Sequence, residues 1–261
     1  IDRYLMTMLN YLQDINIQMD FISYHYNSEL EQNLRKYNSR LFVVHNLKHP
    51  LKQYKEMRQI LIDEQYDTCY FNISEAFNCV GIYSSYKANV SKVIVHSHSS
   101  QSGGTNGIVR NIRTCIHKLF KNKLSKWSTN RLACSEVAGE WMFNQDFKTI
   151  YNAVDYPRFK FNKDKQIELK NKYDLNGYKI LGHVSNFSYA KNTSFLIEVI
   201  HSLPDTYKLL LIGDGPEQFK CKELVKQYKL EEKVVFTLSK KPDFFSWAVT
   251  PPWDMNTRMS A

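Results

Sequence analysis

The chain has 261 residues, enough for one large domain or two ordinary ones. With 43% hydrophobic and 14% aromatic residues it can bury a sizeable core, which excludes a largely disordered protein. Its formal net charge of +9 indicates an anionic partner such as nucleic acid, a membrane surface or a phosphate-bearing substrate, without choosing among them.

The first half of the chain alternates short β-rich runs with helical patterns. An opening helix is predicted over residues 2–13, because apolar residues recur there at helical spacing. Strands are predicted at 18–22, 41–44, 68–71, 93–96, 132–134 and 149–151. Helical patterns separate most of them, at 51–64, 74–86 and 109–126. Strand alternating with helix predicts a parallel, doubly wound sheet.

Segment 152–165 interrupts this alternation with Pro157 and polar residues, so we predict a linker there. The pattern then restarts, with helices at 164–173, 193–202 and 217–228 and strands at 178–184, 208–212 and 233–237. We therefore predict an α/β protein of two doubly wound, Rossmann-like lobes, 1–154 and 155–261, with a cleft between them. The tail from Ser239 leaves the pattern, so the second lobe is expected to be incomplete.

The cysteines show no CxxC or zinc-type spacing and are predicted to be ordinary small core residues in a reducing compartment, which indicates the cytoplasm. No apolar run approaches the roughly 18 residues of a membrane-spanning helix. The five cysteines are Cys69, Cys79, Cys115, Cys134 and Cys221.

Because the chain opens on Ile1, already in a helical pattern, we expect further residues upstream.

Two strand-to-helix junctions in the second half have the features of anion sites. LGHVSNFSYAKNTSFLIEVI (181–200) places Lys191 just before a helix, where unpaired N–H groups and a partial positive charge already favour an anion. LLLIGDGPEQ (209–218) contains Gly213 and Gly215, which permit close backbone approach to a ligand. The alternative for the first junction is a solvated lysine beside a helix capped by Thr193.

These two junctions, in ILGHVSNFSYAKNTSFLIEVI and KLLLIGDGPEQFKCKELVKQYKLEEKVVFT, resemble the donor-binding half of retaining glycosyltransferases of the GT-B fold. More narrowly they resemble family 4, which includes capsular and exopolysaccharide enzymes. The resemblance covers about residues 1–240, with VIVHSHSS (93–100) and TIYNAVDYPRF (149–159) at the expected places. It implies retaining transfer of a sugar from a nucleotide diphosphate donor to a polysaccharide or lipid-linked oligosaccharide acceptor.

The resemblance also implies a place and a donor site for this reaction. The enzyme would work in the cytoplasm, peripherally at the inner face of the cell membrane, and without a metal or other cofactor. Lys191 would hold the donor diphosphate, the glycine turn would lie beside the nucleotide, and Thr237 would lie near the base. The residues assigned to donor binding are Ser185, Asn186, Lys191, Gly213, Asp214, Gly215 and Thr237.

Two departures from the family pattern concern activity. Family members commonly carry Gly-Arg where this chain has Ser185 and Asn186, which removes a charge-assisted phosphate contact of about 1.5–3 kcal/mol. The family's Glu-x7-Glu motif is expected beyond residue 240 and has no counterpart there. The same spacing at Glu56/Glu64 and Glu223/Glu231 falls in ordinary helical segments and is coincidental.

In the first half, His98 matches the histidine that ends a strand and faces the donor sugar, and it is the candidate catalytic residue. The alternative is a polar surface-loop histidine. A metal pair of His96 and His98 is disfavoured, because no further acidic or cysteine ligand accompanies it.

The segment VRNIRTCIHKLFKNKLSKWSTNR (109–131) predicts a basic amphipathic helix, suited to an anionic membrane surface or an acidic acceptor. The alternative is a packed helix with a solvated charged side. Its apolar positions are Ile112, Ile116, Leu119, Leu124 and Trp127. The basic residues proposed for acceptor or membrane contact are Arg110, Arg113, Lys118 and Lys121, near Lys123.

Three other functions stay open on the sequence alone. A nucleotide-sugar epimerase or a phosphorylase could use the same two lobes. An inactive remnant that keeps only binding or membrane attachment fits the two departures. A basic nucleic-acid-binding protein fits the charge, but no recognised base-reading module is present, so we expect no nucleic-acid partner.

Overall fold

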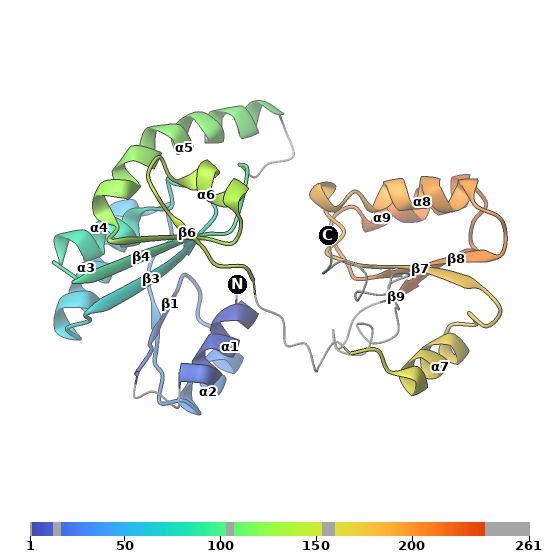
Figure 1. The fold of residues 1–261 in the computed structure, drawn as a ribbon, viewed down its shortest axis with the longest axis horizontal. Coiled ribbons are helices and arrows are strands. Elements are labelled where there is room, and N and C mark those ends of the chain that lie inside the picture. The colour runs from blue at the N-terminus through green and yellow to red at the C-terminus, as the bar shows by residue number, and fades with distance from the viewer. Residues whose placement is uncertain (1, 13–16, 103–106, 153–159, 238–261) are drawn as a thin grey trace, which may run out of the picture. The chain divides into compact units, whose positions relative to one another are not determined.

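The computed structural model describes residues 2–12, 17–102, 107–152 and 160–237 (Figure 1). The chain divides into two compact units, Ile1–Ala153 (unit 1) and Val154–Ala261 (unit 2), and the predicted boundary after residue 154 lies one residue from this division. The predicted tail beyond residue 238 and half of the predicted linker, residues 153–159, lie outside the described residues.

Unit 1 contains parallel strands in two sheets. The smaller sheet pairs β1 (Phe21–Ser23) with β2 (Leu41–Val43). The larger has the order β3-β4-β5-β6, so every strand pairs with its neighbour in the chain. Its strands are β3 (Thr68–Ile73), β4 (Lys92–Ser97), β5 (Asn130–Ala133) and β6 (Lys148–Thr149). Strands are therefore present near all the predicted places, but they do not form one continuous sheet.

Six helices are described in this part of the chain, and two of them were not predicted. Asn27 caps α2 by accepting the Leu30 N–H, and Ser135 caps α6 by accepting the Ala138 N–H. The predicted helix at 74–86 is shorter than expected, because residues 74–77 form a bend and a turn and the helix begins only at Val80. The helices are α1 (Asp2–Leu12), α2 (Ser28–Arg35), α3 (Pro50–Asp63), α4 (Val80–Lys87), α5 (Gly107–Trp127) and α6 (Glu136–Met142).

The core of unit 1 lies between the larger sheet and its helices. Val93 and Val95 of β4 pack with Ile82 of α4, Leu124 of α5 and Met142 of α6, all of them buried. Burial of these aliphatic side chains provides most of the driving force for holding the helices on the sheet. The cysteine prediction is only partly right: Cys79 is buried here, as is Cys221 in unit 2, but Cys115 is exposed on the outer side of α5.

Unit 2 is a three-stranded parallel sheet, β7 (Lys179–Val184), β8 (Tyr207–Ile212) and β9 (Val234–Thr237), in chain order. Figure 1 shows α8 (Thr193–Ser202) and α9 (Gln218–Gln227) over one face of this sheet and α7 (Lys163–Lys172) on the other.

The central strand β8 is buried on both faces. Leu209 and Leu211 pack in a cluster with α8 and α9, whereas Leu210 and Ile212 pack in a second cluster with Leu169 of α7. Such two-sided burial is typical of parallel sheets covered by helices on both faces. The predicted α/β fold with parallel, Rossmann-like sheets is thus confirmed.

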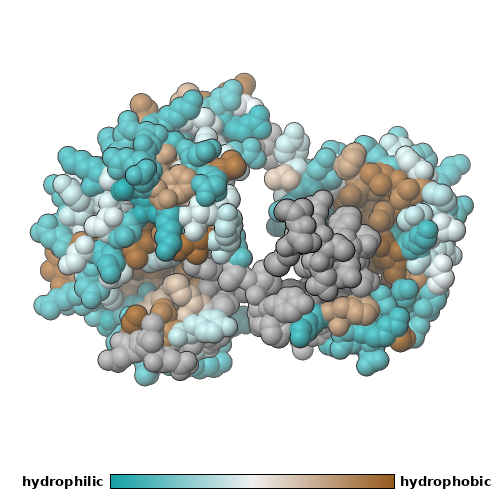
Figure 2. All heavy atoms as spheres, in the orientation of Figure 1, coloured by the Kyte–Doolittle hydropathy of each residue, from teal (hydrophilic) through white to brown (hydrophobic). Residues whose placement is uncertain are grey.

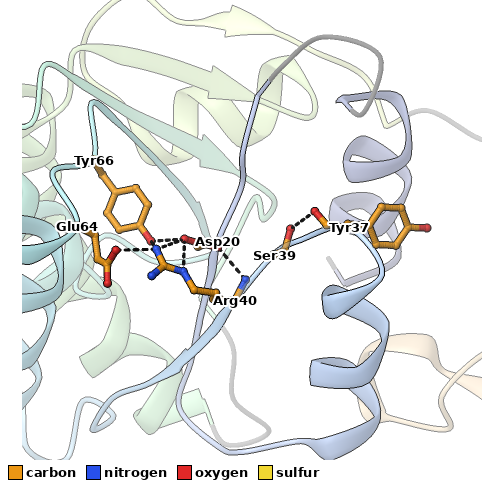
Figure 3. Close-up of polar contacts among 6 residues, drawn as sticks. All are labelled: Asp20, Tyr37, Ser39, Arg40, Glu64 and Tyr66. Carbon is orange, nitrogen blue, oxygen red and sulfur yellow. Dashed lines mark hydrogen bonds and ion pairs between the residues drawn. The ribbon is translucent and has the colours of Figure 1, made fainter.

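A polar cluster joins the beginnings of three strands in unit 1 (Figure 3). Asp20, whose side chain is 3% exposed, accepts hydrogen bonds from the Arg40 backbone N–H and Nη2, each at 2.7 Å, and from the Tyr66 hydroxyl at 2.5 Å. Arg40 also contacts the Glu64 carboxylate at 2.7 Å. Burial alone would raise the pKa of Asp20, but the hydrogen bonds from Arg40 and Tyr66 outweigh it and hold that pKa below its ordinary value.

Replacing Asp20 with Asn should lower the free energy of unfolding by about 2–3 kcal/mol, because a buried carboxylate that accepts charged hydrogen bonds is lost. Urea unfolding followed by tryptophan fluorescence measures this difference. Asp146→Asn, which removes an exposed carboxylate from the same unit, is the matched control and should change stability by less than about 0.5 kcal/mol. Equal midpoints for the two variants would contradict the structural role of the cluster.

Candidate functional site

The two predicted junctions of unit 2 lie against each other at the carboxyl edge of its sheet. The loop 185–192 follows β7, and the loop 213–217 follows β8. The Phe187 N–H donates to the Asp214 carbonyl at 2.9 Å, and the Glu217 N–H donates to the Phe187 carbonyl at 2.8 Å. The Phe187 side chain is fully buried beneath them. The two loops therefore form one surface.

Two glycines allow this close packing. Gly213 has φ +138°, and a Cβ there would lie 1.9 Å from the Ser185 carbonyl oxygen. A Cβ at Gly215 would lie 2.5 Å from the Asn186 side-chain oxygen and 2.6 Å from the Phe187 carbonyl oxygen. Real Cβ atoms do not approach backbone atoms so closely, so any larger residue would push the loops apart.

Gly213→Ala should therefore lower the free energy of unfolding by about 2 kcal/mol or more, through both the backbone clash and the unfavourable φ. Urea unfolding followed by circular dichroism measures the change. The control is Gly107→Ala at the start of α5, where an added Cβ meets nothing within 4 Å. A Gly213→Ala variant as stable as this control would show that the two loops do not require glycine.

Lys191 lies at the end of a short 3₁₀ turn, Tyr189–Lys191, directly before α8. Lys191 is exposed, and its ammonium group forms no ion pair with any residue that the structure describes. The N-cap of α8 is Asn192, in the left-handed conformation with φ 44° and no side-chain capping bond. Thr193 is instead the first helical residue and is buried, so the Thr193 cap of the alternative is wrong, whereas its exposed lysine agrees with the structure.

A histidine that the sequence analysis did not single out contacts both ends of this loop. His183 of β7 has its Nε2 2.7 Å from the Ser185 hydroxyl and 3.4 Å from the Thr193 hydroxyl, so it links both ends of the loop. Burial, and then the charge of Lys191, lowers the pKa of His183 and favours the neutral imidazole. The signal in the sequence was a polar residue inside the apolar strand pattern LGHV.

The remaining donor-binding predictions fall at the same edge. Asp214 is exposed, and its Oδ1 accepts the Gly215 N–H at 2.7 Å. Thr237, at the end of β9, has its carbonyl bonded to the Gly213 N–H at 2.9 Å and its hydroxyl 2.8 Å from the Tyr173 hydroxyl. Ser185 and Asn186 form the start of the first loop. The structure thus brings all seven predicted donor residues together, and their roles stay predictions.

His98 lies in unit 1, directly after β4. Its Nε2 is 2.7 Å from the Asn72 side-chain oxygen on β3, and its ring centroid is 4.1 Å from that of His96. Because an amide oxygen only accepts hydrogen bonds, this contact places a proton on Nε2. Burial lowers the pKa of His98. The ring is therefore held at the carboxyl edge of the larger sheet rather than on a loose surface loop.

A cavity of about 270 Å³ opens at the carboxyl ends of the first three strands of unit 1. Tyr24 follows β1, Asn46, Leu47 and Lys48 follow β2, and Asn78 follows β3. The Tyr24 hydroxyl accepts a hydrogen bond from the buried Gln53 side chain at 3.3 Å. Sequence reasoning missed this cavity, because its walls come from three loops that only the fold brings together.

The four basic residues predicted for acceptor or membrane contact on α5 differ in their surroundings. Arg113 forms a two-bonded ion pair with Glu75, whose side chain is 5% exposed, and lies over the Phe77 ring. Lys121 donates to the Glu140 carbonyl at 2.6 Å. Arg110 and Lys118 are exposed. Arg113 and Lys121 therefore help to hold α5 on its unit, whereas Arg110 and Lys118 face solvent.

The described ranges contain neither a cluster of metal-ligating side chains nor a helix able to span a bilayer. No group of three or more His, Cys, Asp or Glu side chains there could hold a metal ion. None of the helices described combines the length and apolar character needed to cross a bilayer.

A segment of the second unit is similar to a known protein family. Residues 165–245 match the family Glycosyl transferases group 1. All seven predicted donor residues fall in this segment. The match, with GT-B-like structural neighbours, supports a glycosyltransferase of the GT-B fold.

Curated relatives are similar over part of the chain. N-acetyl-alpha-D-glucosaminyl L-malate synthase of Bacillus anthracis is 36% identical over 96 residues, 36% of this chain and 25% of that protein. The putative glycosyltransferase EpsF of Bacillus subtilis (strain 168) is 28% identical over 128 residues, 45% of this chain and 33% of that protein. The matched segments thus span a third or less of these relatives.

Solved structures share the fold over most of the chain. Anabaena Alr3699/HepE in complex with UDP-glucose has a TM-score of 0.71 at 17% identity, covering 90% of this chain and 65% of that one. A glycosyltransferase from Rickettsia africae ESF-5 has a TM-score of 0.69 at 18% identity, covering 94% of this chain and 65% of that one. At this level of identity the likeness shows the fold alone.

Proposed function

We propose that the chain transfers a sugar from a nucleotide diphosphate donor to a polysaccharide or lipid-linked oligosaccharide acceptor, with retention of anomeric configuration. The observation that carries the proposal is the single surface formed by loops 185–192 and 213–217, inside the segment that matches group 1 glycosyl transferases. A neighbour of the same fold was crystallised with UDP-glucose, which supports a nucleotide-sugar donor.

The proposed chemistry is electrostatic. Breaking the anomeric bond builds positive character on the sugar and negative charge on the departing diphosphate. The Lys191 ammonium group and the first N–H groups of α8 stabilise that negative charge as it develops. His183 keeps the Ser185 and Thr193 hydroxyls in place around the same loop. These fixed charges and dipoles are proposed to act without a metal ion.

The remaining roles complete the proposal. Asn186 occupies the position of the family arginine and donates one neutral hydrogen bond, so donor affinity is lower than with an arginine. Thr237 lies beside the base. His98 positions the donor sugar, and its contact with Asn72 fixes the ring for that purpose. The cavity beside Lys48 and Tyr24 belongs to the acceptor side, where an ammonium group and amides suit a polar, acidic acceptor.

The location is part of the same proposal. A lipid-linked acceptor is held at a membrane, so the enzyme works in the cytoplasm, peripherally at the inner face of the cell membrane. Capsular or exopolysaccharide synthesis is the corresponding process, and the name of the similar EpsF protein is compatible with a transferase of this kind.

Titration calorimetry with UDP tests the donor site. The chain should bind UDP, and Lys191→Ala should weaken that binding roughly tenfold to a hundredfold, because one charged hydrogen bond to phosphate is lost. Lys226→Ala, which removes an exposed lysine from α9 of the same unit, should leave UDP affinity unchanged. No heat of binding at millimolar UDP would favour an inactive remnant, and equal affinities for all three proteins would exclude Lys191 from the site.

Product analysis with a radiolabelled nucleotide sugar separates the proposed transfer from its rivals. A transferase moves the label onto the acceptor and releases the nucleoside diphosphate. An epimerase leaves the label on the nucleotide, and a phosphorylase places it on a sugar phosphate. Either of these last products would replace the proposed function while leaving the donor site intact.

A further inference from the structure

The first half of α5 exposes a row of large apolar side chains. Ile108 is 70% exposed, Ile112 55%, Ile116 38% and Leu119 72%, and Val109 beside them is 46% exposed. Spacings of four, four and three residues place the first four on one side of the helix. Figure 2 shows hydrophobic residues among hydrophilic ones along the edge of unit 1 where Figure 1 places α5. We call this row the α5 apolar face.

The α5 apolar face is not the side by which the helix is attached to its unit. Attachment uses Leu124 and His117, both almost fully buried. The His117 Nδ1 accepts the Ala76 N–H at 3.0 Å, and its Nε2 donates to the Trp141 carbonyl at 2.9 Å. The ion pair of Arg113 with Glu75 adds a third anchor. One side of α5 therefore packs against unit 1 through these contacts, and the α5 apolar face is a different, exposed side.

The charges on α5 are all of one sign. The helix has 21 residues and contains no acidic one. Arg110, Lys118, Lys123 and Lys126 are exposed on it. Lys118 flanks the row on one side, and Lys123 and Lys126 continue it toward the end of the helix. This bordering positive charge matches an anionic surface and opposes pairing with the same face of a second copy.

We propose that the α5 apolar face is the surface by which this chain lies on a bilayer of anionic lipids. The apolar side chains enter the boundary between headgroups and acyl chains, and the ammonium groups of Lys118, Lys123 and Lys126 contact lipid phosphates. A helix that lies in this plane needs one apolar stripe and basic flanks, and it need not be long enough to cross the bilayer. This surface deepens the membrane location given in the proposed function, and vesicle binding tests it separately from sugar transfer.

Co-sedimentation with vesicles tests the proposal. The full chain should bind vesicles of phosphatidylcholine with phosphatidylglycerol, and it should bind vesicles of phosphatidylcholine alone at least tenfold more weakly, because the basic flank then has no counter-charge. Raising the salt concentration should weaken binding to the anionic vesicles. Failure to bind anionic vesicles would overturn the proposal, whatever the result with UDP.

Matched variants assign the binding to α5. The triple change Ile112→Ser, Ile116→Ser and Leu119→Ser should weaken binding to anionic vesicles on the order of tenfold or more. The control triple is Leu51→Ser, Ile62→Ser and Ile167→Ser, whose side chains are 77%, 41% and 46% exposed on other helices. Equal losses in the two triples would overturn the proposal. Thermal melting confirms that both remain folded, as expected for exposed positions.

A charge series gives an independent readout. Lys118→Gln, Lys123→Gln and Lys126→Gln together should weaken binding to anionic vesicles roughly tenfold or more. The same loss of charge at Lys222, Lys226 and Lys229 of unit 2 should have a much smaller effect. Light scattering without vesicles checks the alternative occupant. A dimer that the α5 serine triple converts to monomer would show that the face covers a second copy, and would overturn the bilayer assignment.

Discussion

The architecture of the donor site depends on a backbone contact that leaves no room for a side chain. At Gly213 the turn after β8 passes directly beside the carbonyl of Ser185, and at Gly215 it passes beside the backbone of Phe187. This contact lets two loops from neighbouring strands share hydrogen bonds around the buried Phe187 ring. Lys191 belongs to the first of these loops and is exposed directly before the Asn192 cap of α8.

Unit 1 is organised by a different kind of interaction. Its first three strands begin near a cluster of charged and phenolic groups around Asp20. Its longest described helix is fixed by a histidine that bonds two backbone groups and by an ion pair with a nearly buried carboxylate. Polar contacts of this kind are directional, so they determine which side of a helix faces inward. The side of α5 that carries Ile112 and Leu119 is outside for this reason.

The sequence predicted the order of the elements better than the details of the site. The helix at 193–202 has the predicted bounds, because its apolar pattern begins and ends sharply. Helices α2 and α6 were missed, since eight and seven residues give too few turns for a periodic signal. The partner of Arg113 could not be predicted, because Glu75 lies 38 positions away in the sequence. The cavity beside Tyr24 and the support of Ser185 by His183 likewise depend on tertiary contacts.

The strand order has a kinetic consequence. In the described ranges, each strand pairs only with strands that directly precede or follow it in the chain. A growing polypeptide can therefore add one strand and one covering helix at a time, and no strand waits with an open edge for a distant partner still to be synthesised. Closing such short loops costs little entropy compared with the long-range pairings of many parallel sheets. The sheets can therefore form in the order in which the ribosome releases their strands.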